Sequence, residues 1–95
     1  MKDPLTTPQP GDSEHLRGLR LRLSVLRYSA ARIETNAALR RAVRPTPATR
    51  AEFERFRRRD YDAVKRAKEY RAQAARLVNE ITAAEELARA VAELI

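Results

Sequence analysis

The sequence predicts an all-α fold: an antiparallel two-helix hairpin, coiled-coil-like, whose second helix is longer than its first. Three observations predict it: a helix-forming composition, a heptad repeat of apolar residues, and one internal proline segment. Ala, Arg, Leu, Glu and Lys make up 56 of the 95 residues, more than the roughly half that is typical of long helices. Leu, Ile, Val and Phe number only 20. We therefore expect a thin core that oligomerisation or a partner completes into a helical bundle.

Residues 1–12 precede the first helix and contain three prolines and a glycine. Proline fixes the backbone and removes an N–H donor, so this segment is predicted to be an extended arm that is disordered unless something binds it. Asp12 or Ser13 is expected to accept hydrogen bonds from the free N–H groups of the first helix. That helix is predicted over about residues 13–43.

Pro45 and Pro47 interrupt the helical pattern and predict a loop over residues 44–48, because a proline disfavours helical geometry in the residue before it. Thr49 and Glu52 have the spacing of a capping box, in which the threonine hydroxyl accepts from the third residue of the helix. No breaker follows, so the second helix is predicted over about residues 49–95.

Apolar residues recur at alternating spacings of three and four in both helices, the pattern of a heptad seam. The first helix has Leu16, Leu19, Leu23, Leu26, Ala30, Ile33 and Ala37 in its seam; the second has Phe53, Phe56, Asp60, Ala63, Ala67, Tyr70, Ala74, Leu77, Ile81, Ala84, Ala88, Val91 and Ile95. Folding at the prolines predicts that residues whose numbers sum to 93 face each other. Asp60, the one charged seam residue, is expected either to lean outward to an arginine or to fix register.

In this register the N-terminal end of the first helix lies opposite Leu77. The part of the second helix that follows Leu77 is therefore uncovered. The predicted partner interface is this apolar overhang: Ile81, Ala84, Leu87, Ala88, Val91, Leu94 and Ile95. A weaker second stripe on the first helix, formed by Leu21, Val25, Tyr28 and Leu39, is a candidate contact face. The alternative is that these are scattered exposed apolar residues, which are normal singly.

Charge is distributed unevenly: residues 1–15 carry a net −2, residues 16–76 carry +12 and residues 77–95 carry −3. Arginines gather near the predicted loop, and such a cluster is suited to neutralising phosphates. The alternative is a solvated face whose arginines pair with nearby carboxylates. The predicted polyanion-binding residues are Arg40, Arg41, Arg44, Arg50, Arg55, Arg57, Arg58 and Arg59.

The residue inventory argues against several functional classes. Cysteine is absent and His15 is the one histidine, so no disulfide framework, metal site or cofactor is predicted. No nucleophile paired with a base is evident, and the chain is not expected to be an enzyme. No stretch approaches ~18 consecutive apolar residues, so no membrane partner is expected and the expected compartment is cytoplasmic.

These observations lead to one functional hypothesis and one alternative. The hypothesis is a non-enzymatic helical-hairpin interaction module that self-associates, or docks on another helical protein, and presents its basic end to a polyanion. Nucleic acid, contacted through its backbone phosphates, is the favoured polyanion. The alternative is a purely structural or assembly subunit, for example of a phage particle or a multiprotein complex, that binds acidic protein surfaces.

Overall fold

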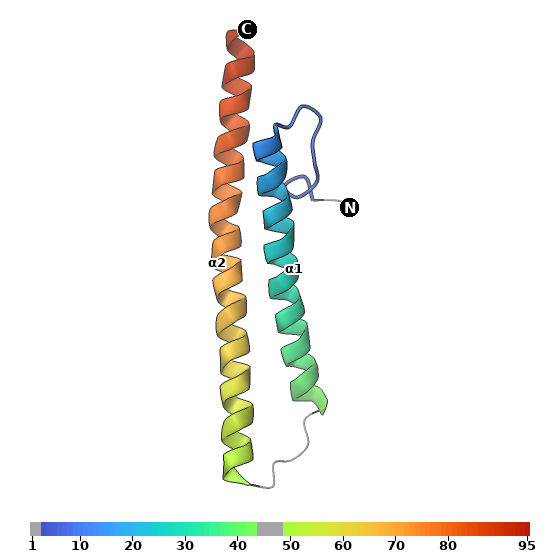
Figure 1. The fold of residues 1–95 in the computed structure, drawn as a ribbon, viewed down its shortest axis with the longest axis vertical. Coiled ribbons are helices and arrows are strands. Elements are labelled where there is room, and N and C mark those ends of the chain that lie inside the picture. The colour runs from blue at the N-terminus through green and yellow to red at the C-terminus, as the bar shows by residue number, and fades with distance from the viewer. Residues whose placement is uncertain (1–2, 44–48) are drawn as a thin grey trace.

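Two long antiparallel helices form the fold (Figure 1). In the computed structural model, which describes residues 3–43 and 49–95, α1 spans Glu14–Val43 and α2 spans Arg50–Leu94. The molecule is a rod of 70 × 22 × 16 Å. The predicted all-α hairpin with a longer second helix is confirmed, and the two described ranges contain no strand. The predicted loop over residues 44–48 lies outside the described residues.

Side-chain caps begin both helices, as the sequence predicts. The Ser13 hydroxyl accepts a hydrogen bond from the Leu16 backbone N–H at 3.2 Å. The Thr49 hydroxyl accepts one from the Glu52 N–H at 3.1 Å, with the Thr49 backbone in an extended conformation. Each cap satisfies one of the four N–H groups that a helix leaves without an internal partner, which explains why the helices begin where they do.

The core is divided unequally along the rod. In the half nearer the N-terminus, a continuous cluster buries large side chains from both helices: Leu16, Leu19, Leu23, Ala74, Leu77 and Ile81. In the half nearer the residue 44–48 segment, the buried hydrophobic residues are all alanines: Ala30, Ala37 and Ala67. We call these the arm half and the loop half. Because burial of apolar area is the main stabilising term, most of the hairpin's stability is expected to come from the arm half.

The predicted register is wrong: ion pairs between the helices join residues whose numbers sum to 8–12 more than the predicted 93, a shift of more than one heptad. The ion pairs Arg20–Glu85, Glu34–Arg71 and Arg41–Asp60 cross between the helices, and their residue numbers sum to 105, 105 and 101 rather than 93. A slip of seven residues keeps the same seam facing the partner helix, so the heptad pattern alone does not distinguish the two registers. The shift lets α2 extend beyond α1 at both ends, as Figure 1 shows.

Residues 3–12 of the arm are folded back onto the helices, whereas the sequence predicts an extended arm that is disordered unless something binds it. Gln9, Pro10, Gly11 and Asp12 form a reverse turn: the Asp12 N–H donates to the Gln9 carbonyl at 3.1 Å, and Gly11 has a φ of 84°. Proline followed by glycine at the centre is the pattern of a type II turn, whose third position needs positive φ. The turn returns Leu5 to the arm-half core, against which it packs.

The buried Arg20 guanidinium holds the arm in place. Arg20 is 2% exposed; its Nε lies 2.8 Å from the Asp12 carboxylate, and its Nη1 donates to the Pro4 and Leu5 carbonyls at 3.0 and 3.1 Å. Glu85 of α2 lies 3.6 Å away. The arginine therefore connects the arm, α1 and α2. The sequence alone does not indicate this role, because Arg20 is one of many arginines and its partners Pro4, Leu5 and Asp12 lie in a segment predicted to be an extended arm.

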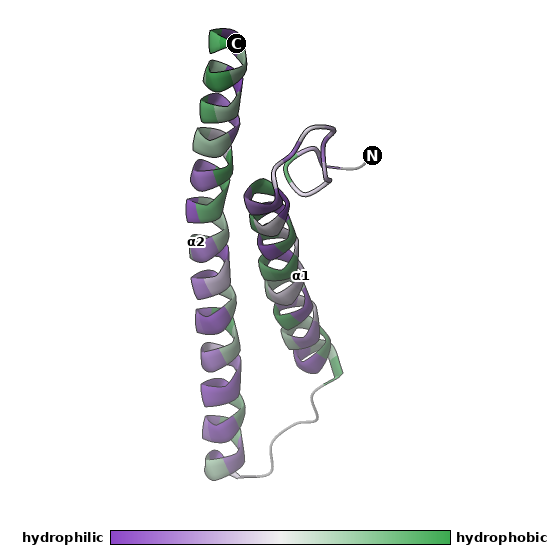
Figure 2. Cartoon of the chain, turned by 45° about the horizontal axis from the view of Figure 1, so that its top comes forward, coloured by the Kyte–Doolittle hydropathy of each residue, from purple (hydrophilic) through white to green (hydrophobic). Residues whose placement is uncertain are grey.

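The surface changes character along α2, as the hydropathy colouring of Figure 2 shows. The loop half of the helix is largely hydrophilic on its outer side, and the C-terminal end is more hydrophobic. Neither α1 nor α2, within the residues that the structure describes, has an apolar segment long enough to cross a lipid bilayer.

Candidate functional site

The strongest candidate for a binding site is an open groove of about 510 Å³ in the loop half, between α1 and α2. We call it the arginine groove. Five arginines line it: Arg40, Arg55, Arg58, Arg59 and Arg66. Its other lining residues are Ile33, Asn36, Asp62 and Ala63. Asp62 is its one acidic lining residue, so the groove is strongly basic.

Helical periodicity explains how α2 builds its wall of the groove. Arg55, Arg59, Asp62 and Arg66 are separated by four, three and four residues, so they lie along one side of the helix. The small Ala63 side chain, which lines the groove beside Ile33, leaves space between the helices. Two features of the sequence therefore form the groove: arginines at helical spacing provide a wall, and an alanine leaves space beside it.

Arg40 is the one groove arginine from α1, and its Nε is buried without a hydrogen-bond partner in the described part of the chain. An unsatisfied buried donor costs about 1–3 kcal/mol, and the cost is removed when an acceptor binds. The guanidinium presents its donors in a planar fork that matches phosphate or carboxylate oxygens. Arg40 thus provides an unsatisfied donor at a groove already suited to anions.

Four of the eight predicted polyanion-binding residues line this groove: Arg40, Arg55, Arg58 and Arg59. Arg41, Arg50 and Arg57 do not line it. Arg50 lies 3.3 Å from the Glu54 carboxylate, Arg57 lies 5.9 Å from the centre of the Phe53 ring, and Arg44 lies outside the described residues. Arg66 was missed by sequence reasoning, although its spacing of seven from Arg59 gives the signal that identifies it.

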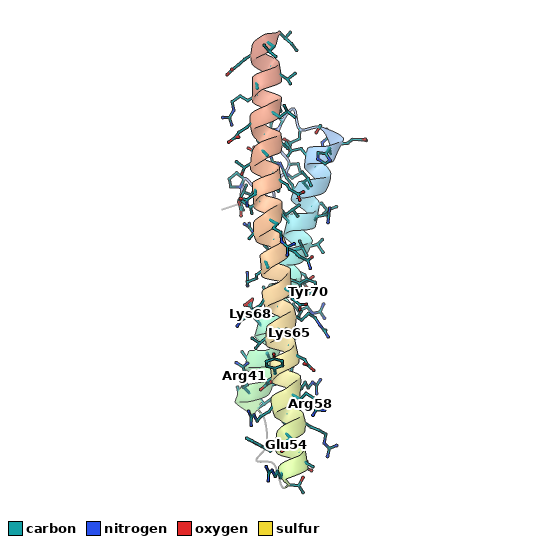
Figure 3. All side chains as sticks on the ribbon, turned by 90° about the vertical axis from the view of Figure 1, so that its left-hand side faces the viewer. Arg41, Glu54, Arg58, Lys65, Lys68 and Tyr70 are labelled. Carbon is teal, nitrogen blue, oxygen red and sulfur yellow. The ribbon has the colours of Figure 1, made fainter. Side chains whose placement is uncertain are left out.

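Arg41 lies on the other side of the hairpin from Arg58, as Figure 3 shows. Its Nε is 3.5 Å from the Asp60 carboxylate, which explains the charged position in the α2 seam: Asp60 forms an ion pair with an arginine of the opposite helix. A smaller groove of about 230 Å³ lies on this side, and it is bridged by the Glu34–Arg71 ion pair. Hydrogen bonding to Glu34 raises the pKa of Arg71. Arginines on this side are therefore matched with carboxylates.

The predicted partner interface is only partly exposed. Ile81 is completely buried in the arm-half core and Ala84 is half-buried against it, because the register shift brings the start of α1 further along α2. Leu87, Val91 and Leu94 are 68%, 49% and 87% exposed. Ala88 and Ile95 are exposed as well. The apolar overhang that remains, here called the C-terminal tail, is residues 86–95, about 15 Å at 1.5 Å per residue.

Metal-ligating side chains do not converge in residues 3–43 and 49–95. His15 is exposed in the first turn of α1. No group of three or more His, Cys, Asp or Glu side chains in residues 3–43 and 49–95 is arranged to hold a metal ion. The geometry of the arginine groove instead suits electrostatic recognition of an anion.

Comparison of the chain with protein-family models, with curated proteins and with solved structures gives no match.

Proposed function

We propose that this chain is a non-enzymatic interaction module that binds a polyanion, with nucleic acid as the favoured ligand, through the arginine groove. The observation that carries the proposal is the concentration of five arginines around one open groove with a single aspartate. Phosphates spaced along a nucleic-acid backbone match several such cations at once, and counterion release then favours binding. The arginines of the groove are suited to phosphate oxygens, so the expected recognition is mainly of the phosphate backbone.

The test is a binding titration of the full chain with fluorescently labelled nucleic acid over a series of salt concentrations. The groove variant is Arg58→Glu with Arg59→Glu, and the matched control is Arg22→Glu with Arg76→Glu. Both double variants change the net charge equally, and all four arginines are exposed. We expect the groove variant to lose at least ~10-fold more affinity than the control and to show a smaller salt slope.

Equal losses in the two variants would contradict a localised site, and absence of binding at low salt would overturn the polyanion proposal. The assembly-subunit alternative is tested in the same assay with poly-glutamate as the competitor. If poly-glutamate displaces nucleic acid at an equal concentration of charge, the groove recognises carboxylate-rich protein surfaces as well as it recognises phosphates.

We further propose that the chain self-associates through its C-terminal tail. The specific observation is that α2 continues past the start of α1 with Leu87, Val91 and Leu94 exposed, and that this surface is continuous with the seam that α1 covers. Leu94→Asp is expected to reduce association in sedimentation velocity without changing the melting temperature. A monomer at all concentrations of the unmodified chain would overturn this part of the proposal.

A further inference from the structure

The surface of α1 that points away from α2 carries a second apolar stripe. Leu21, Val25 and Tyr28 are 66%, 55% and 65% exposed. Their spacings of four and three put them on one face of the helix. Leu39 and Val43, which are 58% and 78% exposed, lie further along the same face. We call this surface the outer face of α1. An apolar stripe on both sides of a helix is expected where other helices cover both sides.

The C-terminal tail has a stripe of the same geometry. Leu87, Val91 and Leu94 repeat the spacings of four and three found in Leu21, Val25 and Tyr28. The tail stripe and the Leu21–Tyr28 part of the outer face each extend over seven residue steps, or about 10 Å along the helix. Two apolar stripes of equal length, both exposed, therefore match each other in size.

The charges around the two stripes are opposite. Arg17 lies four residues before Leu21 and Arg32 lies four residues after Tyr28, so arginines occur at both ends of the outer-face stripe, and both are exposed. Glu86 and Glu93 flank the tail stripe and are exposed. Residues 86–95 contain Glu86, Glu93 and Arg89, a net charge of −1, and Arg89 lies on the side of the helix opposite the stripe. Opposite charges favour contact of the tail with the outer face, whereas pairing of two tails would bring like charges together.

The tail cannot reach the outer face of α1 in the same molecule. α2 is one uninterrupted helix over Arg50–Leu94, and it lies against the opposite side of α1, the side that carries Leu19 and Leu23. We infer that the acidic apolar tail of one copy docks on the basic outer face of α1 in a second copy. This inference rests on the proposed self-association and names the surface that the tail binds.

The experiment uses two full-length variants, Val25→Asp on the outer face and Val91→Asp on the tail. Both side chains are about half exposed, so both variants are expected to keep the helical circular dichroism of the unmodified chain. Each variant alone is expected to raise the dissociation constant for self-association at least ~10-fold, or about 1.4 kcal/mol. Mixed together, they are expected to associate, because each supplies the surface that the other lacks.

Tyr61→Asp is the control, since Tyr61 is 68% exposed and lies on neither stripe; it is expected to self-associate like the unmodified chain. If either aspartate variant loses helicity, the pair Tyr28→Ser and Leu94→Ser repeats the test. Normal association of Val25→Asp, or failure of the mixture to associate, would overturn the inference and leave self-association through the tail intact. A monomeric unmodified chain would overturn both, while polyanion binding is measured independently.

Discussion

The two halves of the hairpin use arginine in opposite ways. In the arm half, Arg20 is buried and bonded to the Asp12 carboxylate and to two arm carbonyls. In the loop half, five arginines line a groove with one aspartate. Two factors account for this difference between Arg20 and the groove arginines: the number of nearby hydrogen-bond acceptors and the size of the side chains in the seam. Where leucines fill the seam and acceptors are close, an arginine is structural; on the groove side of the loop half, where alanines leave space and Asp62 is the one acidic lining residue, arginines are available to a ligand.

Leu23→Asp should have the largest effect on the arm half. Leu23 is completely buried, and an aspartate there loses apolar packing and buries a charge without a partner. We expect loss of cooperative folding, measured as loss of helical circular dichroism and of a thermal transition. Tyr61→Asp is the control, because Tyr61 is 68% exposed and lies on neither apolar stripe, and it should change stability by no more than about 0.5 kcal/mol. Equal effects would contradict the assignment of the core.

Ile81→Ala distinguishes the observed register from the one predicted by the sequence. Ile81 is fully buried, whereas Val91 on the same helix is 49% exposed. Truncating a buried isoleucine costs about 2–5 kcal/mol, whereas Val91→Ala should stay within about 0.5 kcal/mol when the chain is dilute enough to be dissociated. Urea unfolding measures both. In the register predicted from the sequence, the N-terminal end of α1 lies opposite Leu77, so Ile81 and Val91 are both uncovered. That register predicts similar, small effects for the two variants.

Arg20→Met tests whether the arm half depends on its buried arginine. Methionine keeps much of the apolar length of the side chain but leaves the Asp12 carboxylate and the arm carbonyls without their donor. We expect the arm to detach and the melting temperature to fall by about 4–8 °C. Limited proteolysis should then cut within residues 3–12. Arg22→Met, at an exposed position on the same helix, should leave both readouts unchanged.

Lowering the pH should release the arm gradually, with a smaller loss of stability than the substitutions above. The hydrogen bond from Arg20, and then that from the Gln9 N–H, lower the pKa of Asp12; the Leu5 N–H and Arg27 lower that of Asp3. Because these pKa values are lower in the folded state, the stabilisation is complete above the usual value near 3.8 and is lost as pH falls through the folded values. NMR shifts of the Leu5 methyl groups should report release. In Asp12→Asn this dependence should be reduced to the contribution of Asp3.

The sequence and the structure agree best on the elements that local chemistry decides. Ser13 and Thr49 begin the helices as predicted, because a cap depends on residues within one turn. Four groove arginines could be named from their clustering along the chain. Arg66 shows the limit of that reasoning, since it lies outside the sequence cluster and joins the groove only through helical periodicity.

By itself, the sequence determined two helices, their seams and a basic loop half, because composition, capping and heptad periodicity are properties of short segments. Only the tertiary structure decided which heptads face each other, because a slip of seven residues presents the same seam and differs only in long-range packing and ion pairs. The fold of the arm was decided in the same way. Its prolines exclude a helix, but the carbonyls of Pro4 and Leu5 and the carboxylate of Asp12 meet Arg20 only when the chain turns back at Gly11.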